Sequence, residues 1–240
     1  MGPAHVQFSV STSQPAPAPP ASALRLRVLD EVAAIVLAAG DGRLRVAVDG
    51  RTAAGKSTFG HELAGRLADA GRPVLRASLD DFKRPWAERH LYDRESGEGF
   101  YRNAFDHDQV RDLLLDPAAP GGSGDVVLCA LDTFAQVART DVVDHVPPDG
   151  VLVVDGVFAL RPELDDAWDV RVRVEVPAAV ALARGVRRDD PTWSGADPTE
   201  LHRDRYAAAE AVYLREVDPL SHADVVVDNT DPQAPRLLHP

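Results

Sequence analysis

The chain of 240 residues is poor in several residue types, and each shortage excludes a class of protein. Cys129 is the single cysteine, so no intramolecular disulfide and no zinc site built from several thiolates can form. Its apolar neighbours predict a buried thiol. Long apolar runs are also missing, because the longest, residues 32–39, falls well below the roughly 20 residues of a membrane-spanning helix. We therefore expect no membrane partner.

Basic residues are outnumbered by acidic ones, which gives the chain a net charge of −12. A general nucleic-acid-binding protein needs a basic face for the phosphate backbone, so we expect no nucleic-acid partner. A small anionic ligand is still compatible with this charge, since it needs only a local cluster of cations. The N-terminus lacks the basic region and apolar core of a secretory signal, and we expect a cytoplasmic location.

The most informative stretch is GRTAAGKS at residues 50–57, which fits the pattern G-x-x-x-x-G-K-[ST] at every fixed position. An apolar, β-branched run precedes it, and apolar residues spaced four apart follow it, so it lies between a strand and a helix. There, backbone N–H groups and the helix start suit a phosphate. Lys56 can reach the β- and γ-phosphate oxygens, and the Ser57 hydroxyl can bind Mg²⁺. The predicted nucleotide-binding residues are Gly50, Arg51, Thr52, Ala53, Ala54, Gly55, Lys56, Ser57 and Thr58.

Strands and helices alternate along most of the chain. Strands are predicted at residues 44–49, 73–79, 126–131, 151–156, 170–176 and 223–227, and helices at 22–39, 56–70, 106–115 and 199–217, with one more opening at Pro177. Several strands are continuously apolar, as in a sheet covered on both faces, which indicates a three-layer α/β fold with a mostly parallel sheet. The Pro/Ala-rich residues 1–21 are expected to be a disordered tail, and residues 22–240 a single domain.

Carboxylates follow two of the predicted strands, and ligands of parallel sheets bind at the carboxyl ends of strands. Asp155 follows the run VLVV, where it could support a metal together with Ser57 or could simply cap the next turn. Asp80 and Asp81 end the strand after the first core helix. One of them could accept the proton of an attacking hydroxyl, the alternative being a helix or turn cap. Adjacent carboxylates point in different directions, so only one of the two is expected to face the site.

Three arginines gather near the end of the helix that opens at Pro177: Arg184, Arg187 and Arg188. Helical spacing puts Arg184 and Arg188 on one face, where they could act as a lid that stabilises charge on a transferring phosphate. The alternative is a solvated helix end that complements the helix dipole.

Six segments carry a joint resemblance. They are GRTAAGKS, LDDF at 79–82, AFDH at 104–107, VLVVDGVFAL at 151–160, RGVRRD at 184–189 and ADVVVDN at 223–229. In this order they resemble the uridine kinase and phosphoribulokinase family of small-molecule P-loop kinases, over about residues 44–229, which is most of the chain. Only the phosphate loop is specific by itself.

The resemblance implies a P-loop nucleoside triphosphate hydrolase fold, with a mostly parallel five-stranded sheet and a helical lid at about residues 184–200. ATP and Mg²⁺ are the implied cofactors, and a small-molecule alcohol is the implied acceptor. Asp80 falls on the family's general base, and Arg184 and Arg188 fall on its lid arginines. Asp106 falls on the residue that holds the acceptor's sugar hydroxyls, and we place Asp81 beside it as an acceptor-binding residue.

The chain departs from the family's nucleoside kinases at two places. The stretch LDTFAQ lacks the Tyr and His near the base pocket, and PTWSGADP has no clear match to a further lid arginine. The segment 83–105 has no clear periodicity and could supply another acceptor pocket through Tyr92, Tyr101 and Arg102, or be an ordered surface excursion.

The favoured function is phosphoryl transfer from ATP to the 5′-hydroxyl of a pyrimidine ribonucleoside. The first alternative is a kinase for another small alcohol, such as a pantothenate-like or sugar-phosphate acceptor. A regulatory P-loop ATPase is less favoured, because Asp80 suits activation of an alcohol better than switching. The sequence leaves open whether the chain forms a homo-oligomer.

Overall fold

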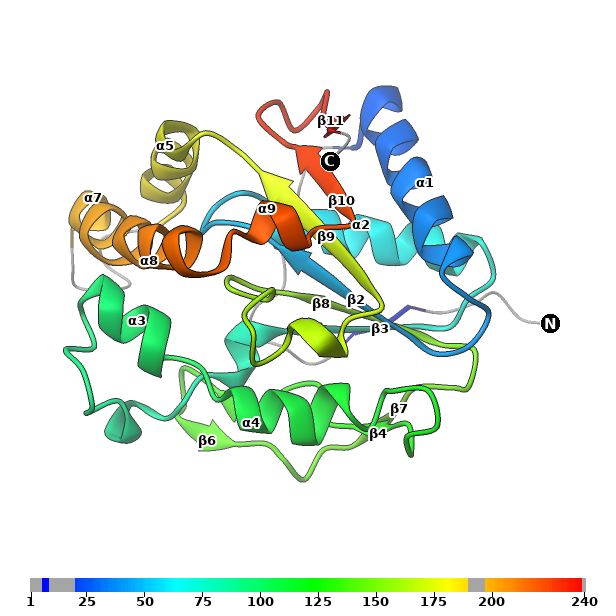
Figure 1. Cartoon of the computed structure of the whole chain (residues 1–240), viewed down its shortest axis with the longest axis horizontal. Helices are drawn as coiled ribbons and strands as arrows, with labels where there is room; N and C mark the ends of the chain where they lie inside the picture. The colour runs from blue at the N-terminus through cyan, green and yellow to red at the C-terminus, as the bar shows by residue number, and fades with distance from the viewer. Residues whose placement is uncertain (1–5, 9–19, 190–196, 239–240) are drawn as a thin grey trace.

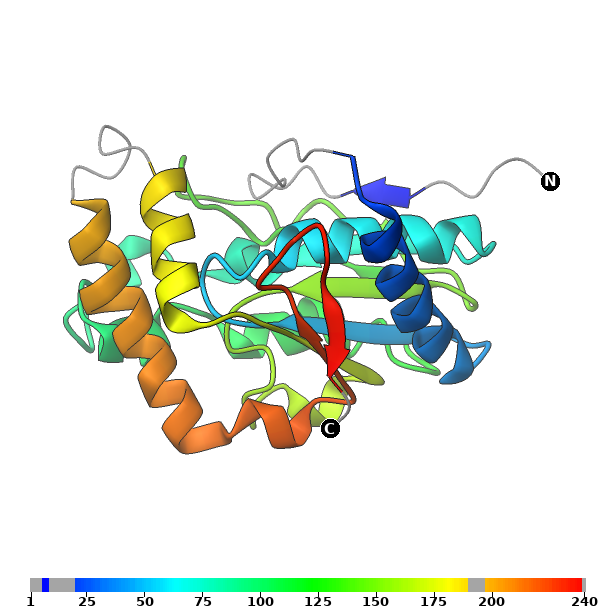
Figure 2. The ribbon, with the colours of Figure 1, turned by 90° about the horizontal axis from the view of Figure 1, so that it is seen from above.

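The computed structural model describes residues 6–8, 20–189 and 197–238, which form a central sheet with helices on both faces (Figures 1 and 2). The seven strands lie in the order β1-β3-β8-β2-β9-β10-β11. Their bounds are Val6–Phe8 (β1), Leu44–Asp49 (β2), Val74–Ser78 (β3), Val151–Asp155 (β8), Val170–Glu175 (β9), Val225–Asp228 (β10) and Arg236–Leu238 (β11). All neighbours are parallel except β10 and β11. The predicted α/β fold with a mostly parallel sheet is confirmed.

The sheet has seven strands where five were predicted, because a short strand lies at each edge. The backbone of β1 pairs with β3 inside the segment that was expected to be a disordered tail; residues 1–5 and 9–19 of that segment lie outside the described residues. β11 folds back antiparallel onto β10. Strands of three residues show no alternation of polar and apolar side chains, so sequence periodicity could not reveal them.

Two helical layers cover the sheet. On one face lie α1 (Ala23–Ala38) and α2 (Lys56–Asp69), whose Leu29, Phe59 and Leu63 are fully buried. The other face holds α3 (Gly97–Asn103), α4 (His107–Val110) with the π-helix η3 (Arg111–Leu115), and α8 (Ala208–Val217). Every residue of β2, β3 and β8 is buried, as the continuous apolar run predicted for β8; in β2 and β3 the buried residues include Arg45 and Arg76. No helix in the described ranges combines the length and apolar character needed to cross a bilayer.

A pair of helical segments stands beside the carboxyl ends of the strands (Figure 2). The first is α5 (Ala178–Arg188). The second runs from α7 (Pro198–Glu200) through the π-helix η5 (Leu201–Ala207) into α8, matching the predicted helix 199–217, and α9 (Pro219–His222) follows. The expected lid spans this pair, but residues 190–196 lie outside the described residues.

The predicted strand at residues 126–131 is wrong. Only its ends are paired, in two small hairpins: β4 (Asp125–Val126) with β7 (Asp144–His145), and β5 (Leu131–Asp132) with β6 (Val137–Ala138). Residues 127–130 are nevertheless buried, and Cys129 is a buried free thiol as expected. The N–H groups of Val127 and Ala130 donate to Leu113 and Asp81 carbonyls at 2.8 and 3.1 Å, which satisfies this backbone outside a sheet.

The segment 83–105 is more regular than its sequence suggested. It contains a short 3₁₀ turn, η2 (Trp86–Glu88), and the helix α3. Ser96 caps α3, since its hydroxyl accepts a hydrogen bond from the Gly99 N–H at 3.0 Å. Two glycines in so short a helix hid its periodicity.

Candidate active site

The loop between β2 and α2 has backbone conformations that few side chains tolerate. Gly50 and Gly55 have φ values of 150° and 96°, and a Cβ at Gly50 would collide with the Val174 carbonyl. Ala53 also has a positive φ of 63°, which costs an L-residue about 1 kcal/mol or more. Backbone that changes between negative and positive φ in this way turns successive N–H groups toward the inside of the loop. Gly55 is the N-cap of α2 and offers no side chain to its first-turn N–H groups, which suits an incoming anion.

Lys56 lies across this loop. Its side chain is buried, and Nζ donates a hydrogen bond to the Arg51 carbonyl at 2.9 Å. Burial lowers the pKa of the Lys56 ammonium, while the nearby carboxylates of Asp80, Asp155 and Asp49 oppose that shift. An ammonium held this way can exchange a carbonyl for phosphate oxygens without leaving the loop.

Ser57 and Asp155, the predicted metal-binding pair, are adjacent. The Ser57 hydroxyl donates to Asp155 Oδ2 at 2.5 Å, and the buried Arg76 donates to Oδ1 of the same carboxylate at 2.5 Å. In the described part of the chain no group of three or more His, Cys, Asp or Glu side chains could hold a metal. Mg²⁺ suits a smaller set, because it keeps several waters and takes the rest of its ligands from phosphates. Two hard oxygen donors beside the phosphate loop fit that ion.

Asp80 and Asp81 diverge, as expected of neighbours. Asp80 lies in η1 (Leu79–Phe82) at the end of β3, and Lys83 Nζ is 2.7 Å from its Oδ1. Burial raises the pKa of Asp80, but Lys83, Lys56 and Arg188 outweigh burial and hold it below the ordinary aspartate value. The carboxylate is therefore ionised and able to accept a proton at neutral pH.

Asp81, in contrast, is completely buried. Burial, reinforced by the Asp81 carboxylate, raises the pKa of Cys129 to about 11, so Asp81 faces the buried segment 127–130. The geometry favours Asp80 as the general base. It gives no support to Asp81 as an acceptor-binding residue, because that side chain points into the protein.

The two lid arginines have different surroundings. Arg184 donates to the carbonyls of Asn229 and Thr230, both at 3.0 Å, and burial together with Arg187 lowers its pKa. Arg188 is exposed, and its Nε donates to Asp189 Oδ1 at 2.8 Å. Its charge also acts on Asp80. Arg188 is thus the arginine nearer to the candidate base.

The phosphate loop adjoins the helical pair. A cavity of about 30 Å³ lies between Arg51 of the loop, Leu182 of α5 and Tyr206 of η5. That volume holds about one water molecule. A displacement of α5 and η5 by a small distance would therefore change the space above the loop.

Asp106 already has protein partners for both carboxylate oxygens. It caps α4 by accepting from the Gln109 N–H at 3.3 Å, and Arg84 Nη1 lies 3.1 Å from its Oδ2. Its neighbour His107 stacks on Phe105 with ring centroids 6.4 Å apart. Burial, followed by the charge of Arg161, lowers the pKa of His107 to about 4, so the ring is neutral at physiological pH. The role of Asp106 in holding acceptor hydroxyls stays a prediction.

Tyr92, Tyr101 and Arg102 do not form the acceptor pocket proposed from sequence. Tyr92 is exposed, whereas Tyr101 is a core residue whose ring packs edge-on against Phe158 at 5.1 Å. Arg102 spans from α3 to α8 by bonding both Glu98 and Glu216. For amphipathic side chains such as Tyr and Arg, the sequence alone does not distinguish a residue that binds a ligand from one that packs against the protein.

Sequence reasoning passed over Asn229, which holds the phosphate loop in place. Its Nδ2 donates to the Ala54 carbonyl at 2.8 Å, and its Oδ1 accepts from Arg25 of α1 at 3.0 Å. A Cβ at Gly55 would lie 2.7 Å from the Asn229 amide nitrogen, so the two are tightly packed. The segment ADVVVDN contributes to the predicted last strand and to the family resemblance, but neither gives Asn229 a role.

A second group that was passed over is the cluster around Arg173, the completely buried arginine of β9. All three guanidinium nitrogens are paired: Nη1 to Asp49, Nε to Glu175 and Nη2 to Glu210, at 2.5, 2.5 and 2.7 Å. Asp49 also accepts from the Tyr213 hydroxyl at 3.1 Å. The cluster lies directly before the phosphate loop and ties it to α8. In VRVRVE, charged residues alternate with valines inside a strand that was expected to be buried, and this pattern was the signal in the sequence for a buried ion pair.

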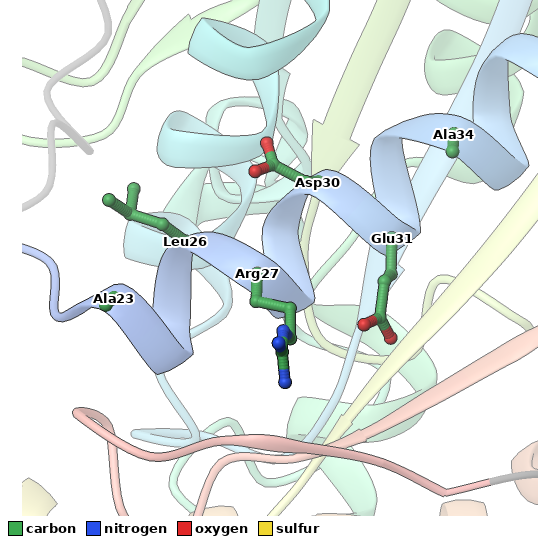
Figure 3. Close-up of a pocket in the computed structure, with 6 residues that line it drawn as sticks. All are labelled: Ala23, Leu26, Arg27, Asp30, Glu31 and Ala34. Atoms are coloured by element: carbon green, nitrogen blue, oxygen red, sulfur yellow. The ribbon is translucent and has the colours of Figure 1, made fainter.

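A separate hollow on the outer face of α1 does not belong to this site (Figure 3). All of its lining side chains come from that one helix, including Leu26, Asp30 and Glu31. Neither the residues of the phosphate loop nor the carboxylates described above line this hollow.

A parallel sheet, a phosphate loop with its lysine, and a carboxylate beside it define a P-loop kinase, the class to which the fold and the site assign the chain. Among curated proteins, the uridine kinase of Staphylococcus aureus (strain JH9) is 28% identical over 145 residues, which are 60% of this chain and 67% of that protein. No protein-family model matches the chain.

Solved structures agree on the fold. A possible uridine kinase from Bacillus stearothermophilus has a TM-score of 0.65 at 23% identity, covering 84% of this chain and 98% of its own. A proposed fructose transport system kinase from Silicibacter sp. TM1040 has a TM-score of 0.62 at 26% identity, covering 77% and 93%. The chain thus shares the fold of P-loop kinases and is similar in sequence to a uridine kinase.

Proposed function

We propose that the protein transfers the γ-phosphoryl group of ATP, in the presence of Mg²⁺, to a hydroxyl group of a small molecule. The observation that carries the proposal is the meeting of three groups at one edge of the sheet: the phosphate loop with Lys56, the Ser57–Asp155 pair, and the ionised Asp80. A cytoplasmic location, with one domain over residues 22–240, completes the proposal.

In this reaction the acceptor oxygen attacks the γ-phosphorus while the bond from that phosphorus to the β,γ-bridging oxygen breaks. Asp80 accepts the proton of the acceptor hydroxyl as the new P–O bond forms, and ADP leaves. Lys56 and the loop N–H groups stabilise the negative charge of the phosphates. Arg188, whose charge reaches Asp80, is positioned to act on the same phosphoryl group.

Ser57 and Asp155 would hold Mg²⁺, which neutralises phosphate charge when it is bound. Arg76 fixes the orientation of Asp155 by occupying its Oδ1 and leaving Oδ2 toward Ser57. A charge-assisted bond of this kind keeps the carboxylate ionised and in place.

Two acceptor classes are candidates. The name of the Staphylococcus aureus relative supports the 5′-hydroxyl of a pyrimidine ribonucleoside such as uridine or cytidine. A small alcohol of the sugar-phosphate or pantothenate-like type is supported by the absence of Tyr and His from LDTFAQ, and by arginines near Asp80 that are described below.

The proposal is tested with the Lys56→Ala variant. Removing the ammonium takes away the charge that meets the β- and γ-phosphates, and we expect phosphoryl transfer to fall by about 10³-fold or more. The measurement is ADP formation that depends on an added acceptor, over a panel of nucleosides and small alcohols. Arg66→Ala is the matched control, because Arg66 lies on the exposed side of the same helix. Unchanged turnover in Lys56→Ala would refute the assigned role of the loop.

A further inference from the structure

Two arginines near each other, of which Arg89 is also within electrostatic range of Asp80, have side-chain nitrogens that the described residues leave unpaired. Arg89 is only 9% exposed, and although its Nε donates to the Arg84 carbonyl at 2.7 Å, its Nη2 has no hydrogen-bond partner within the described ranges. The Nε of Arg205, in η5, likewise has no hydrogen-bond partner within the described ranges. A buried charged donor without an acceptor costs more than about 1–3 kcal/mol, so such nitrogens call for an anion.

The partners that Arg205 does have are weak. Its Nη1 lies 3.5 Å from Glu95, a side chain that is 61% exposed and also 3.3 Å from Arg94. The guanidinium lies over the Phe100 ring, 5.0 Å from its centroid, which fixes its position without supplying an acceptor. One exposed carboxylate shared by two arginines does not neutralise this group.

Positive charge is concentrated here although the whole chain carries a net charge of −12. Burial, followed by the charges of Arg205 and Arg94, lowers the pKa of Arg89 to about 10, and the carboxylate of Asp80 acts on it in the opposite sense. Arg89 is therefore within electrostatic range of both Arg205 and the candidate base.

The elements that carry these arginines belong to segments that pack together. Arg89 lies in the segment between η2 and α3, and Arg205 lies in η5, against which α3 packs (Figure 1). Asp80 also acts on the phenol of Tyr206, the neighbour of Arg205. An acceptor whose hydroxyl meets Asp80 would thus extend between these two elements.

We propose that Arg89 and Arg205 bind an anionic group, a carboxylate or a phosphate monoester, that the acceptor alcohol carries in addition to its reacting hydroxyl. The inference rests on the proposed phosphoryl transfer and selects the second of the two acceptor classes. A planar guanidinium matches either anion through paired N–H donors, and the anion would complete the bonds that the protein leaves unmade.

The experiment uses the full chain saturated with Mg²⁺ and a non-hydrolysable ATP analogue, so that the phosphate loop is already occupied. A sugar monophosphate, a hydroxycarboxylate such as glycerate, the unphosphorylated sugar and uridine are titrated in by calorimetry. We expect at least one anionic alcohol to bind at least about 10-fold more tightly than its uncharged counterpart. If neither anionic alcohol binds, or if uridine binds more tightly than both, the proposal is overturned.

Variants assign the binding to the two arginines. Arg89→Gln and Arg205→Gln should each weaken binding of the anionic alcohol by about 10- to 100-fold, with ATP affinity unchanged within about twofold. Arg94→Gln is the control, since Arg94 is exposed and pairs with Glu95. Arg89→Lys keeps the charge without the paired donors and should show an intermediate loss, which guards against a folding defect in Arg89→Gln.

The failure of this inference differs from failure of the kinase proposal. Turnover of a neutral alcohol that depends on Lys56 but ignores Arg89→Gln would leave the kinase standing and remove the anion site. A lack of any acceptor-dependent ADP formation over the whole panel would instead count against the kinase.

Discussion

Buried arginines lie in two regions near the phosphate loop, and the regions differ in how their nitrogens are paired. Below the loop, Arg173 bonds three carboxylates and has no free nitrogen. On the acceptor side, Arg89 and Arg205 each retain a buried nitrogen without a partner in the described part of the chain. The first region is completed by the protein itself, whereas the second requires a ligand to complete it. Buried charge serves stability in one case and recognition in the other.

The same contrast holds for the carboxylates. Asp49 is fully buried, and its oxygens accept from Arg173, Tyr213 and the Ala159 N–H. Asp80 has a half-exposed side chain and one ion pair, with Lys83. A carboxylate with every lone pair engaged cannot take up a proton easily, so Asp80 is the better base.

The largest expected effect in this comparison is on stability, in Arg173→Met. Removing the guanidinium leaves the buried carboxylates of Asp49 and Glu210 without the counter-charge that they share. We expect the free energy of unfolding to fall by about 3–5 kcal/mol, as when one partner of a buried ion pair is deleted. Urea unfolding followed by circular dichroism measures it.

The matched control is Arg66→Met, whose exposed pair with Asp30 should contribute less than about 1 kcal/mol. A loss below 1 kcal/mol in Arg173→Met would erase the distinction between the two regions.

A smaller effect, on the pH dependence of turnover, is expected on the acceptor side for Lys83→Met. Burial raises the pKa of Asp80, and Lys83 is the largest of the charges that lower it. Without Lys83 that pKa rises, so a larger fraction of Asp80 is protonated at a given acidic pH. The acid limb of kcat/KM should therefore move to higher pH, with stability changed by less than about 1 kcal/mol because the pair is partly exposed.

The measurement is kcat/KM from pH 8 down to the lowest pH at which circular dichroism shows a folded protein, because the acid limb of the unmodified protein lies below the ordinary aspartate pKa. Arg94→Met, which removes an exposed charge that is not among the main ones acting on Asp80, should move the acid limb less. A limb that stays fixed in Lys83→Met, or moves to lower pH, would show that Asp80 does not govern it.

Much of the fold could be predicted from the sequence because its signals are local. Short stretches rich in apolar residues predict β2, β3 and β8, and the G-x-x-x-x-G-K-S pattern predicts the loop and the start of α2. The edge strands β1 and β11 are too short to carry such a signal. The run 126–131 misled because burial in a coil segment and burial in a sheet select the same apolar residues.

The candidate site also contains residues that the sequence predicted and residues that it did not. Lys56, Ser57 and Asp155 come together as their spacing implied, since strand ends and the loop meet at one edge. Tyr101 and Arg102 are instead taken up by packing against Phe158 and by pairing with Glu216. Arg89 could not be recognised as special, because which nitrogens of an arginine find partners depends on distant parts of the chain.

The measurement that tests the central claim most directly is acceptor-dependent turnover in Asp80→Asn against Asp81→Asn, with ATP affinity and thermal stability determined for both. We expect Asp80→Asn to lower kcat by about 10²-fold or more, while ATP affinity and folding stay near those of the unmodified protein. Asp81→Asn, inside the protein, should act through stability. If Asp80→Asn turns over normally while a folded Asp81→Asn does not, the assignment of the base is contradicted.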